Sequence, residues 1–430
     1  MSSKSQRANE TTDGVVGADI TGTNFPLIKK MAQDVNIITA HGLSDAFGRI
    51  RTSNITTLFD SKQVGDNRPL LWDDQEVSGG GTSSTYSVNR SSTTLGVSAS
   101  TAGKRVRQTY QRFNYQPGKS QLVFMTGVLF SSGGGSGISA AMGYFDDNNG
   151  CFVSSINGAV FANIRSYVSG AAVTTSVAQD DWNGDRLDGT GPSGKTLDAS
   201  KAQIWWCDLE WLGVGSVRMG FMIDGAFIAI HTFYNANNST SVYMTTPNLP
   251  LRYEIANDGT GGASTLETIC STVISEGGVD SLGVLRHEDT EAIASLQAAT
   301  KYALLGIRLK SDRKDTSVRI ENISMLCSSS NDLAHWELQF NPTVAGTFTY
   351  ADQTNSGVQI AIGNAANTVT NGTHVDGGYF SAALPVTKAV ENALRLGASI
   401  AGEVDQLVLV CRPITNNITV HASMTWRELS

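Results

Sequence analysis

The most regular pattern of hydrophobic and polar positions lies between residues 203 and 233. In its first segment the apolar side chains occupy every second position, and they are Trp205, Cys207, Leu209 and Trp211. Turn sequences at 213–215 and at Asp224-Gly225 then interrupt the alternation. A period of two places one face of each strand on a core and the other toward solvent. The pattern therefore predicts three antiparallel strands joined by short turns.

Similar runs elsewhere predict a mainly β fold. Three strands in a row cannot bury their apolar face alone, so a second sheet must cover it in a β-sandwich. The Trp-rich strand, turn and strand pattern also resembles the central strands of concanavalin-type jelly rolls. Further strands are predicted within 119–126, 143–153, 302–309, 318–326, 335–340, 358–362, 406–411 and 418–426, and a short helix at 291–303, where Ala and Leu recur at helical spacing.

Polar stretches divide the chain into three parts. Residues 1–45 are predicted to form an extended N-terminal arm, and residues 46–330 a large antiparallel β-sandwich of jelly-roll type. After the polar sequence 327–332, a smaller C-terminal β-domain is predicted at 333–430. Within the arm, Phe25 and Leu27 belong to an isolated apolar group that we expect to contact neighbouring subunits. The alternative is a disordered polar tail.

The composition favours a β-rich assembly protein. Among 430 residues there are 44 Gly and 9 Pro, and only 16% are charged, against roughly 25% in typical soluble domains. The formal net charge of −8 argues against nucleic acid as a partner. No apolar run of about 18 residues occurs and the first residues are polar, so neither a membrane partner nor a secretory signal is expected.

The sequence predicts no cofactor and no metal. The five cysteines are far apart, and their odd number without a secretory signal favours reduced, buried thiols in a protein made in a cytoplasm. The loop at 180–189 places Asp181, Asn183 and Asp185 at calcium-ligand spacing. However, Arg186 and Pro192 stand where an EF-hand loop has Gly and Glu, which leaves an ordinary surface loop as the simpler interpretation.

One pair of carboxylates has the spacing of a catalytic pair. Asp208 and Glu210 share a strand face at about 7 Å, within the range used by glycoside hydrolases. Trp206 has the same parity and Trp182 lies in the neighbouring acidic loop, so both are candidate glycan contacts. The solvent face of a half-buried strand explains the two acids more simply, and no other catalytic motif is present. We therefore expect no catalytic residues.

A basic and aromatic segment lies between residues 105 and 115. Arginines interleaved with Tyr and Phe suit either stacking on single-stranded nucleic acid or protein–protein contacts. The acidic balance of the chain favours the protein contact. The expected interface residues are Arg105, Arg107, Tyr110, Arg112, Phe113 and Tyr115.

Several sequence segments resemble a family of virion structural proteins encoded by tailed bacteriophages and some large algal viruses. The segments that carry the resemblance are AFGRIRTSN at 46–54, LFDSKQ at 58–63, PLLWDD at 69–74, FNYQPGKSQL at 113–122, DWNGDRLDGTGPSGKTLD at 181–198, IWWCDLEWLGVGSVRMGF at 204–221, TPNLPLRYEI at 246–255 and MTWREL at 424–429. They extend over most of the chain beyond residue 45. The resemblance implies a place in the virion and leaves head, tail and fibre open.

The residues and the resemblance together predict a non-enzymatic structural component of a virus particle. We expect a homo-oligomer on the capsid or tail, in contact with itself and with other virion proteins. Two alternatives remain open. One is a receptor-binding or glycan-binding tail or fibre protein that contacts a host surface glycan, and the other is a glycan depolymerase that uses Asp208 and Glu210.

Overall fold

The computed structural model describes residues 53–132, 135–390 and 394–429 of the chain. Within these ranges the regular elements are strands, apart from one turn of 3-10 helix at η1 (Gln179–Asp181). No helix in the described part is long and apolar enough to cross a membrane. The mainly β, antiparallel fold predicted from the sequence is confirmed. The expected arm at 1–45, with Phe25 and Leu27, lies outside the described residues.

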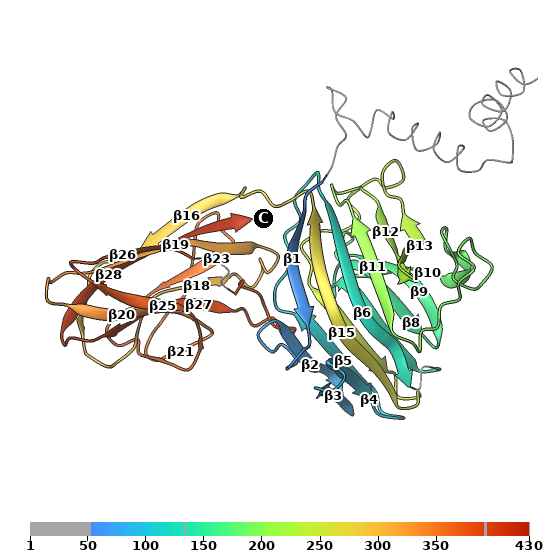
Figure 1. Cartoon of the computed structure of the whole chain (residues 1–430), viewed down its shortest axis with the longest axis horizontal. Coiled ribbons are helices and arrows are strands. Elements are labelled where there is room, and N and C mark those ends of the chain that lie inside the picture. Colours follow the sequence, from blue (N-terminus) through green and yellow to red (C-terminus); the bar gives the residue numbers. More distant parts are fainter. Residues whose placement is uncertain (1–52, 133–134, 391–393, 430) are drawn as a thin grey trace, which may run out of the picture. The chain divides into compact units, whose positions relative to one another are not determined.

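Two antiparallel sheets form the N-terminal sandwich (Figure 1). The eight-stranded sheet runs in the order β13 (Ala226–Phe233), β12 (Val217–Ile223), β11 (Gln203–Leu209), β6 (Ser120–Ser132), β15 (Ser264–Glu276), β4 (Ser92–Val97) and β3 (Thr82–Ser87), with β1 (Ile55–Lys62) also paired to β15. The seven-stranded sheet runs β10 (Val173–Ala178), β9 (Ala159–Ser166), β8 (Gly150–Ile156), β7 (Ile138–Phe145), β14 (Leu251–Asn257), β5 (Gly103–Thr109) and β2 (Trp72–Gly79).

The predicted three-strand segment at 203–233 is β11, β12 and β13, and its inward face has the predicted parity. Trp205 lies opposite Met125 on β6 and Phe221 on β12, and all three side chains are buried between the sheets. From the seven-stranded sheet, the buried Tyr253 donates a hydrogen bond across the core to the carbonyl oxygen of Thr126 at 3.1 Å. Trp211 follows the end of β11 and is only partly buried against this core.

The C-terminal sandwich also consists of two sheets (Figure 1). The five-stranded sheet contains β16 (Val284–Asp289), β28 (Ile418–Leu429), β19 (Ser317–Cys327) and β26 (Val386–Ala389), with β17 (Ile293–Leu296) also paired to β28. The six-stranded sheet contains β22 (Ala351–Asp352), β23 (Val358–Ile362), β18 (Tyr302–Leu309), β27 (Gln406–Pro413), β20 (Leu333–Phe340) and β25 (Thr373–Ser381). Two short strands, β21 (Thr343–Val344) and β24 (Val369–Thr370), pair separately.

Strand pairing crosses the boundary that the sequence places near residue 330. Strands β16 to β19 lie before residue 330, yet they pair with β23, β26, β27 and β28 from beyond it. The sheets therefore divide between β15 and β16, because the apolar faces of β18 and β19 are covered by the later strands. The helix expected at 291–303 is also wrong. Ile293 and Leu296 instead pair with β28 and are buried, and β18 follows them.

Candidate functional site

The two acids that formed the candidate catalytic pair are held by local partners. Asp208 on β11 lies opposite Arg218 on β12, and both oxygens of its carboxylate accept hydrogen bonds from Nε of that arginine at 3.2 and 3.1 Å. Nη2 of Arg218 also bonds the carboxylate. Glu210 follows the end of the strand and accepts hydrogen bonds from the amide and hydroxyl of Ser216 at 3.2 and 2.9 Å. Each carboxylate is therefore engaged within one hairpin.

The two tryptophans expected as exposed glycan contacts are buried. Trp182 retains 4% of its exposure, belongs to the core of the N-terminal sandwich and donates its indole N–H to the carbonyl oxygen of Val177 at 3.1 Å. Trp206 retains 3%, although it faces outward from the eight-stranded sheet. Its ring packs edge-on against Phe227 with centroids 5.3 Å apart, and the guanidinium of Arg218 lies 5.8 Å from its centroid. Neighbouring side chains cover it.

These side chains form an outer aromatic patch, which we define as Phe124, Ile204, Trp206, Met222 and Phe227. Strand register gathers them, because Trp206 lies opposite Phe124 and Ile204 lies opposite Met222, which in turn lies opposite Phe227. Phe227 is 55% exposed and Ile204 is 42% exposed, so part of the patch meets solvent. Sequence reasoning identified Trp206 by its parity but missed Phe227, which lies on β13, two strands further along the chain.

A hollow of about 290 Å³ adjoins the outer aromatic patch. Phe124 belongs to both, and the other walls come from β1, β6 and β15. Its lining combines an acid, a base and hydroxyl groups with the aromatic ring, and consists of Asp60, Ser61, Lys62, Phe124, Thr126, Cys270, Ser271 and Thr272. A half-buried aromatic ring beside hydrogen-bonding groups of both kinds is a surface suited to an uncharged polar ligand.

The outer face of the seven-stranded sheet is occupied by arginine and aromatic side chains. Phe145 and Phe152 stack with centroids 4.3 Å apart, and the guanidinium of Arg165 lies 4.9 Å from the Phe152 ring. The buried Arg252 lies 5.5 Å from the Phe145 ring and bonds Glu254 at 3.0 Å. Burial works to raise the pKa of Glu254, but the opposing effect of Arg252 and Lys104 is larger and lowers it. The positive charges of Arg252 and Lys104 are therefore partly neutralised by the carboxylate of Glu254 within the same sheet.

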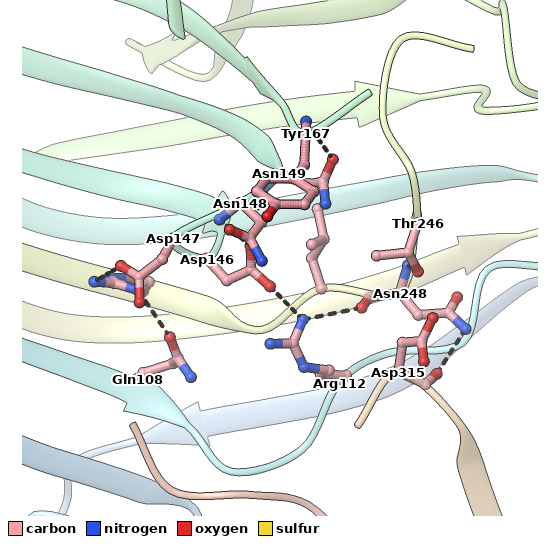
Figure 2. A network of polar contacts seen from close by, with 12 residues as sticks. Gln108, Arg112, Asp146, Asp147, Asn148, Asn149, Tyr167, Thr246, Asn248 and Asp315 are labelled. Carbon is pink, nitrogen blue, oxygen red and sulfur yellow. Dashed lines mark hydrogen bonds and ion pairs between the residues drawn. The ribbon is translucent and has the colours of Figure 1, made fainter. Parts of the chain in front are cut away.

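A polar network extends from this sheet to the neighbouring loops (Figure 2). Arg112 donates one hydrogen bond to the carboxylate of Asp146 at 2.6 Å and a second to the carbonyl oxygen of Asn248 at 3.4 Å. The side-chain amide of Asn248 donates to the carbonyl oxygen of Asp315 at 2.9 Å. Asn149 accepts a hydrogen bond from the amide of Tyr167 at 3.2 Å. Arg112, an expected interface residue, is thus engaged inside the chain.

Three of the other expected interface residues are buried. Arg107 is 1% exposed, its guanidinium lies 5.2 Å from the Trp72 ring, and Asp74 accepts bonds from it at 3.5 Å and from Arg105 at 2.6 Å. Phe113 and Tyr115 are buried in the core, and the carbonyl oxygen of Tyr110 accepts a hydrogen bond from the amide of Ala398. Arg107, Phe113 and Tyr115 are thus buried inside the chain. Arg105 and Tyr110 are only partly buried, so their expected role at an interface stays a prediction.

The described residues contain no group of three or more His, Cys, Asp or Glu placed to hold a metal ion. In the acidic loop, the carboxylate of Asp185 accepts hydrogen bonds from the amides of Leu187 and Ser193 at 2.9 and 2.6 Å. Burial works to raise the pKa of Asp185, but these bonds outweigh it and lower the pKa. The loop owes its shape to Asx-type hydrogen bonds of its own.

Comparisons with known proteins show likeness in fold alone. No family model matches the sequence, and no curated protein matches it. Among solved structures, an endo-1,3-beta-glucanase from Streptomyces sioyaensis aligns over 54% of this chain and 99% of its own, at 11% identity and a TM-score of 0.35. The CBM2 module of the evolved Dit of Lactobacillus casei BL23 phage J-1 aligns over 54% of this chain and 100% of its own, at 5% identity and a TM-score of 0.35.

A carbohydrate esterase from the Shiga toxin-encoding bacteriophage phi24B aligns over 52% of this chain and 100% of its own, at 8% identity and a TM-score of 0.29. Two of these three similar structures therefore come from phages. TM-scores below 0.5 and identities this low carry no argument about what this chain binds or does.

Proposed function

We propose that this protein is a non-enzymatic structural component of a virus particle that assembles with copies of itself on the capsid or tail. The resemblance of its sequence segments to phage and algal-virus virion proteins supports the place in the virion. The observation that carries the assembly is an edge strand of the C-terminal sandwich that is unpaired on one side and begins with exposed apolar side chains. Detection of the protein in purified, infectious particles by mass spectrometry tests the virion assignment, and its absence from such particles would refute it.

This edge strand is β16, which pairs with β28 on one side and with no other strand in the described part. Apolar side chains on and just before it are 43–64% exposed, and they are Val279, Leu282, Val284 and Leu285. An edge strand with unpaired backbone groups is a template for pairing with another chain, and exposed apolar side chains beside it favour such contact. Only the first two residues of β16 are apolar, and Arg286 to Asp289 are polar or charged. We infer that a second copy of this chain pairs with β16 through its own β16, because antiparallel pairing about a two-fold axis is self-complementary.

Self-association through β16 is tested by changing one exposed residue on it. Leu285→Lys is expected to shift the wild-type oligomer to monomer in sedimentation velocity, because an edge lysine blocks strand pairing. The control is Leu384→Lys, which changes a leucine that is 75% exposed outside this strand and should leave the oligomer intact. A monomeric wild type, or an unchanged oligomer in Leu285→Lys, would show that β16 is not the assembly edge.

The non-enzymatic part of the proposal is supported by the pairing of Asp208 with Arg218 and of Glu210 with Ser216. In glycoside hydrolysis one carboxyl group must be protonated and lie in a cleft to act as the general acid. The second carboxylate, which acts as base or nucleophile, must be accessible to the substrate. The double variant Asp208→Asn with Glu210→Gln keeps side-chain size and removes both charges. We expect neither wild type nor variant to cleave host capsule or cell-wall polysaccharide. Cleavage by the wild type that the variant loses would overturn this part.

Glycan binding is the second candidate function, favoured by the outer aromatic patch and the adjoining hollow. The exposed Phe227 ring offers a stacking surface. It lies 5.7 Å from the ring of Phe124, which lines the hollow together with hydroxyl and charged groups. Screening on a glycan array with wild type and Phe227→Ala tests it, with Tyr379→Ala as a control that removes a more exposed ring, at 65% exposure, from the other sandwich. Binding that Phe227→Ala loses and Tyr379→Ala keeps would support a glycan site, and no binding by wild type would exclude it.

A further inference from the structure

Two thiols meet in the core of the N-terminal sandwich. Cys151 lies on β8 of the seven-stranded sheet and Cys207 lies on β11 of the eight-stranded sheet. Their Sγ atoms are 3.1 Å apart, and both residues are 0% exposed. The contact joins positions 56 residues apart in the chain. The two facing sheets therefore bring two thiol groups into direct contact inside the core.

The neighbouring strands hold both thiols in this position. Cys151 lies opposite Tyr144 on β7, and Cys207 lies opposite Val123 on β6 and Met219 on β12. These neighbours are fully buried, which leaves the thiols no room to turn toward solvent. A disulfide needs an S–S distance of about 2.05 Å, so the sulphurs must approach by roughly 1 Å. Bond formation therefore requires the side chains, and the strands that carry them, to move together by this amount.

We propose that Cys151 and Cys207 form a disulfide that links the two sheets of the N-terminal sandwich once the protein meets an oxidising environment. The oxidant is a low-molecular-weight disulfide such as oxidised glutathione. One cysteine thiolate attacks it to form a mixed disulfide and releases one molecule of reduced glutathione. The second thiolate then attacks the protein sulphur and releases the other. Two protein thiols and one oxidised glutathione thus become one protein disulfide and two reduced glutathione molecules.

The same burial that aligns the thiols slows this reaction. Burial, with the hydrogen bond to Cys151, raises the pKa of Cys207, so little thiolate is present while the sandwich is closed. Oxidation therefore proceeds when the sheets open transiently or before they close. Once formed, the bond closes a chain segment from 151 to 207 and restricts the unfolded state. The oxidised protein should consequently melt at a higher temperature.

The other cysteines serve as internal comparisons. Cys327 on β19 and Cys411 on β27 also come from facing sheets and are buried in the C-terminal sandwich. Cys327 lies close enough to add to the rise that burial causes in the pKa of Cys411. Within the described part of the chain, however, a hydrogen bond between two sulphurs joins only Cys151 and Cys207. Cys270 is exposed and has no facing thiol. It reports whether the oxidant reaches a surface thiol at all.

Peptide mapping of the wild-type protein tests the proposal. The full chain is incubated with oxidised glutathione at several urea concentrations below the unfolding transition, alkylated and digested without reduction. We expect a linked peptide pair containing Cys151 and Cys207, together with free Cys327 and Cys411. The oxidised protein should have a Tm higher than the reduced one by roughly 5 °C or more. Cys270 should be glutathionylated or bridged between molecules.

Two variants separate this bond from general oxidation. Cys207→Ser should abolish the rise in Tm on oxidation, whereas Cys411→Ser, a change of a buried thiol in the other sandwich, should keep it. The wild-type map remains decisive if a variant fails to fold. The proposal is overturned if Cys151 and Cys207 stay free while Cys270 is oxidised, if they link to other cysteines instead, or if the linked protein melts at a lower temperature.

Discussion

Adjacent tryptophans on β11 show how burial is decided at the scale of the residue. Trp205 faces the core between the sheets and Trp206 faces outward, yet both are at most 3% exposed. Phe124 covers the outward ring from the adjacent strand β6, and Phe227 covers it from β13 across β12, where Gly220 lies opposite Trp206. A strand that is buried on both faces loses the simple contrast between an apolar core side and a polar solvent side.

The two faces of this sheet should respond differently to truncation. Trp205→Ala removes a fully buried indole and should lower the unfolding free energy by roughly 3–5 kcal/mol. Phe227→Ala removes a ring that is 55% exposed and should cost under about 1.5 kcal/mol. Urea denaturation of both variants against wild type measures the difference. A larger loss for Phe227→Ala would mean that the outer aromatic patch stabilises the sandwich more than its core does.

The unfolding free energy should depend on pH through Asp405. Burial raises its pKa to about 6, hydrogen bonds from Asn341 and Gly397 oppose the rise, and Asp73 adds to it. Because the folded pKa lies above the unfolded one, this group's contribution is favourable at low pH and declines as pH rises from about 4 to 7, by roughly 3 kcal/mol at most.

Asp405→Asn should flatten this part of the pH dependence, because it removes the ionisation and keeps one acceptor for its partners. Chemical denaturation at pH 4, 5, 6 and 7 measures it. Asp312→Asn, at an exposed carboxylate, should leave the wild-type pH dependence in place. Equal slopes for Asp405→Asn and wild type would show that Asp405 titrates alike in both states.

At the scale of the element, one glycine on β12 controls how closely β11, β12 and β13 pack. A Cβ atom at Gly220 would overlap the carbonyl oxygen of Ile228 on β13 and lie 2.9 Å from the Trp206 ring. The ring can lie over the strand only because no side chain rises there. The strand pattern of the sequence accommodates Gly220 as an outward position but gives no sign of the crowding.

Gly220→Ala should therefore destabilise the sandwich by about 1–3 kcal/mol, since the overlap forces the strand or the ring to shift. Gly262→Ala, where a Cβ atom would meet nothing within 4 Å, is the matched control and should change stability by under about 0.5 kcal/mol. Thermal unfolding by circular dichroism compares them. Equal melting temperatures of the two variants would show that the strands accommodate a methyl group at Gly220 without loss of stability.

At the scale of the whole molecule, sheet membership decides where the chain can be divided. Strands β16 to β19 precede residue 330 but complete their sheets with strands from the last part of the chain. A fragment that ends at 330 would leave the buried faces of β18 and β19 uncovered, whereas one that ends at 277 keeps both sheets of the N-terminal sandwich.

Expression of the two fragments tests this division. The fragment 55–277 should be soluble and unfold cooperatively, and the fragment 55–330 should bind a hydrophobic dye and aggregate, because apolar strands without partners remain exposed. Dye fluorescence and light scattering measure the contrast. A soluble, cooperative 55–330 fragment that binds no dye would support the boundary near residue 330 instead.

The sequence by itself determined that β11 and β12 are strands and which of their side chains face the core. A period of two in local hydrophobicity reflects the burial of one strand face directly. It also identified the strands β20, β23, β27 and β28 close to their observed bounds. Only the tertiary structure decided that β16 to β19 join the last strands, since pairing partners far apart in sequence leave no local pattern. It likewise placed Trp182, Trp206, Arg107 and Phe113 inside the chain, because cover for an outward or charged side chain comes from strands and loops that are distant in sequence.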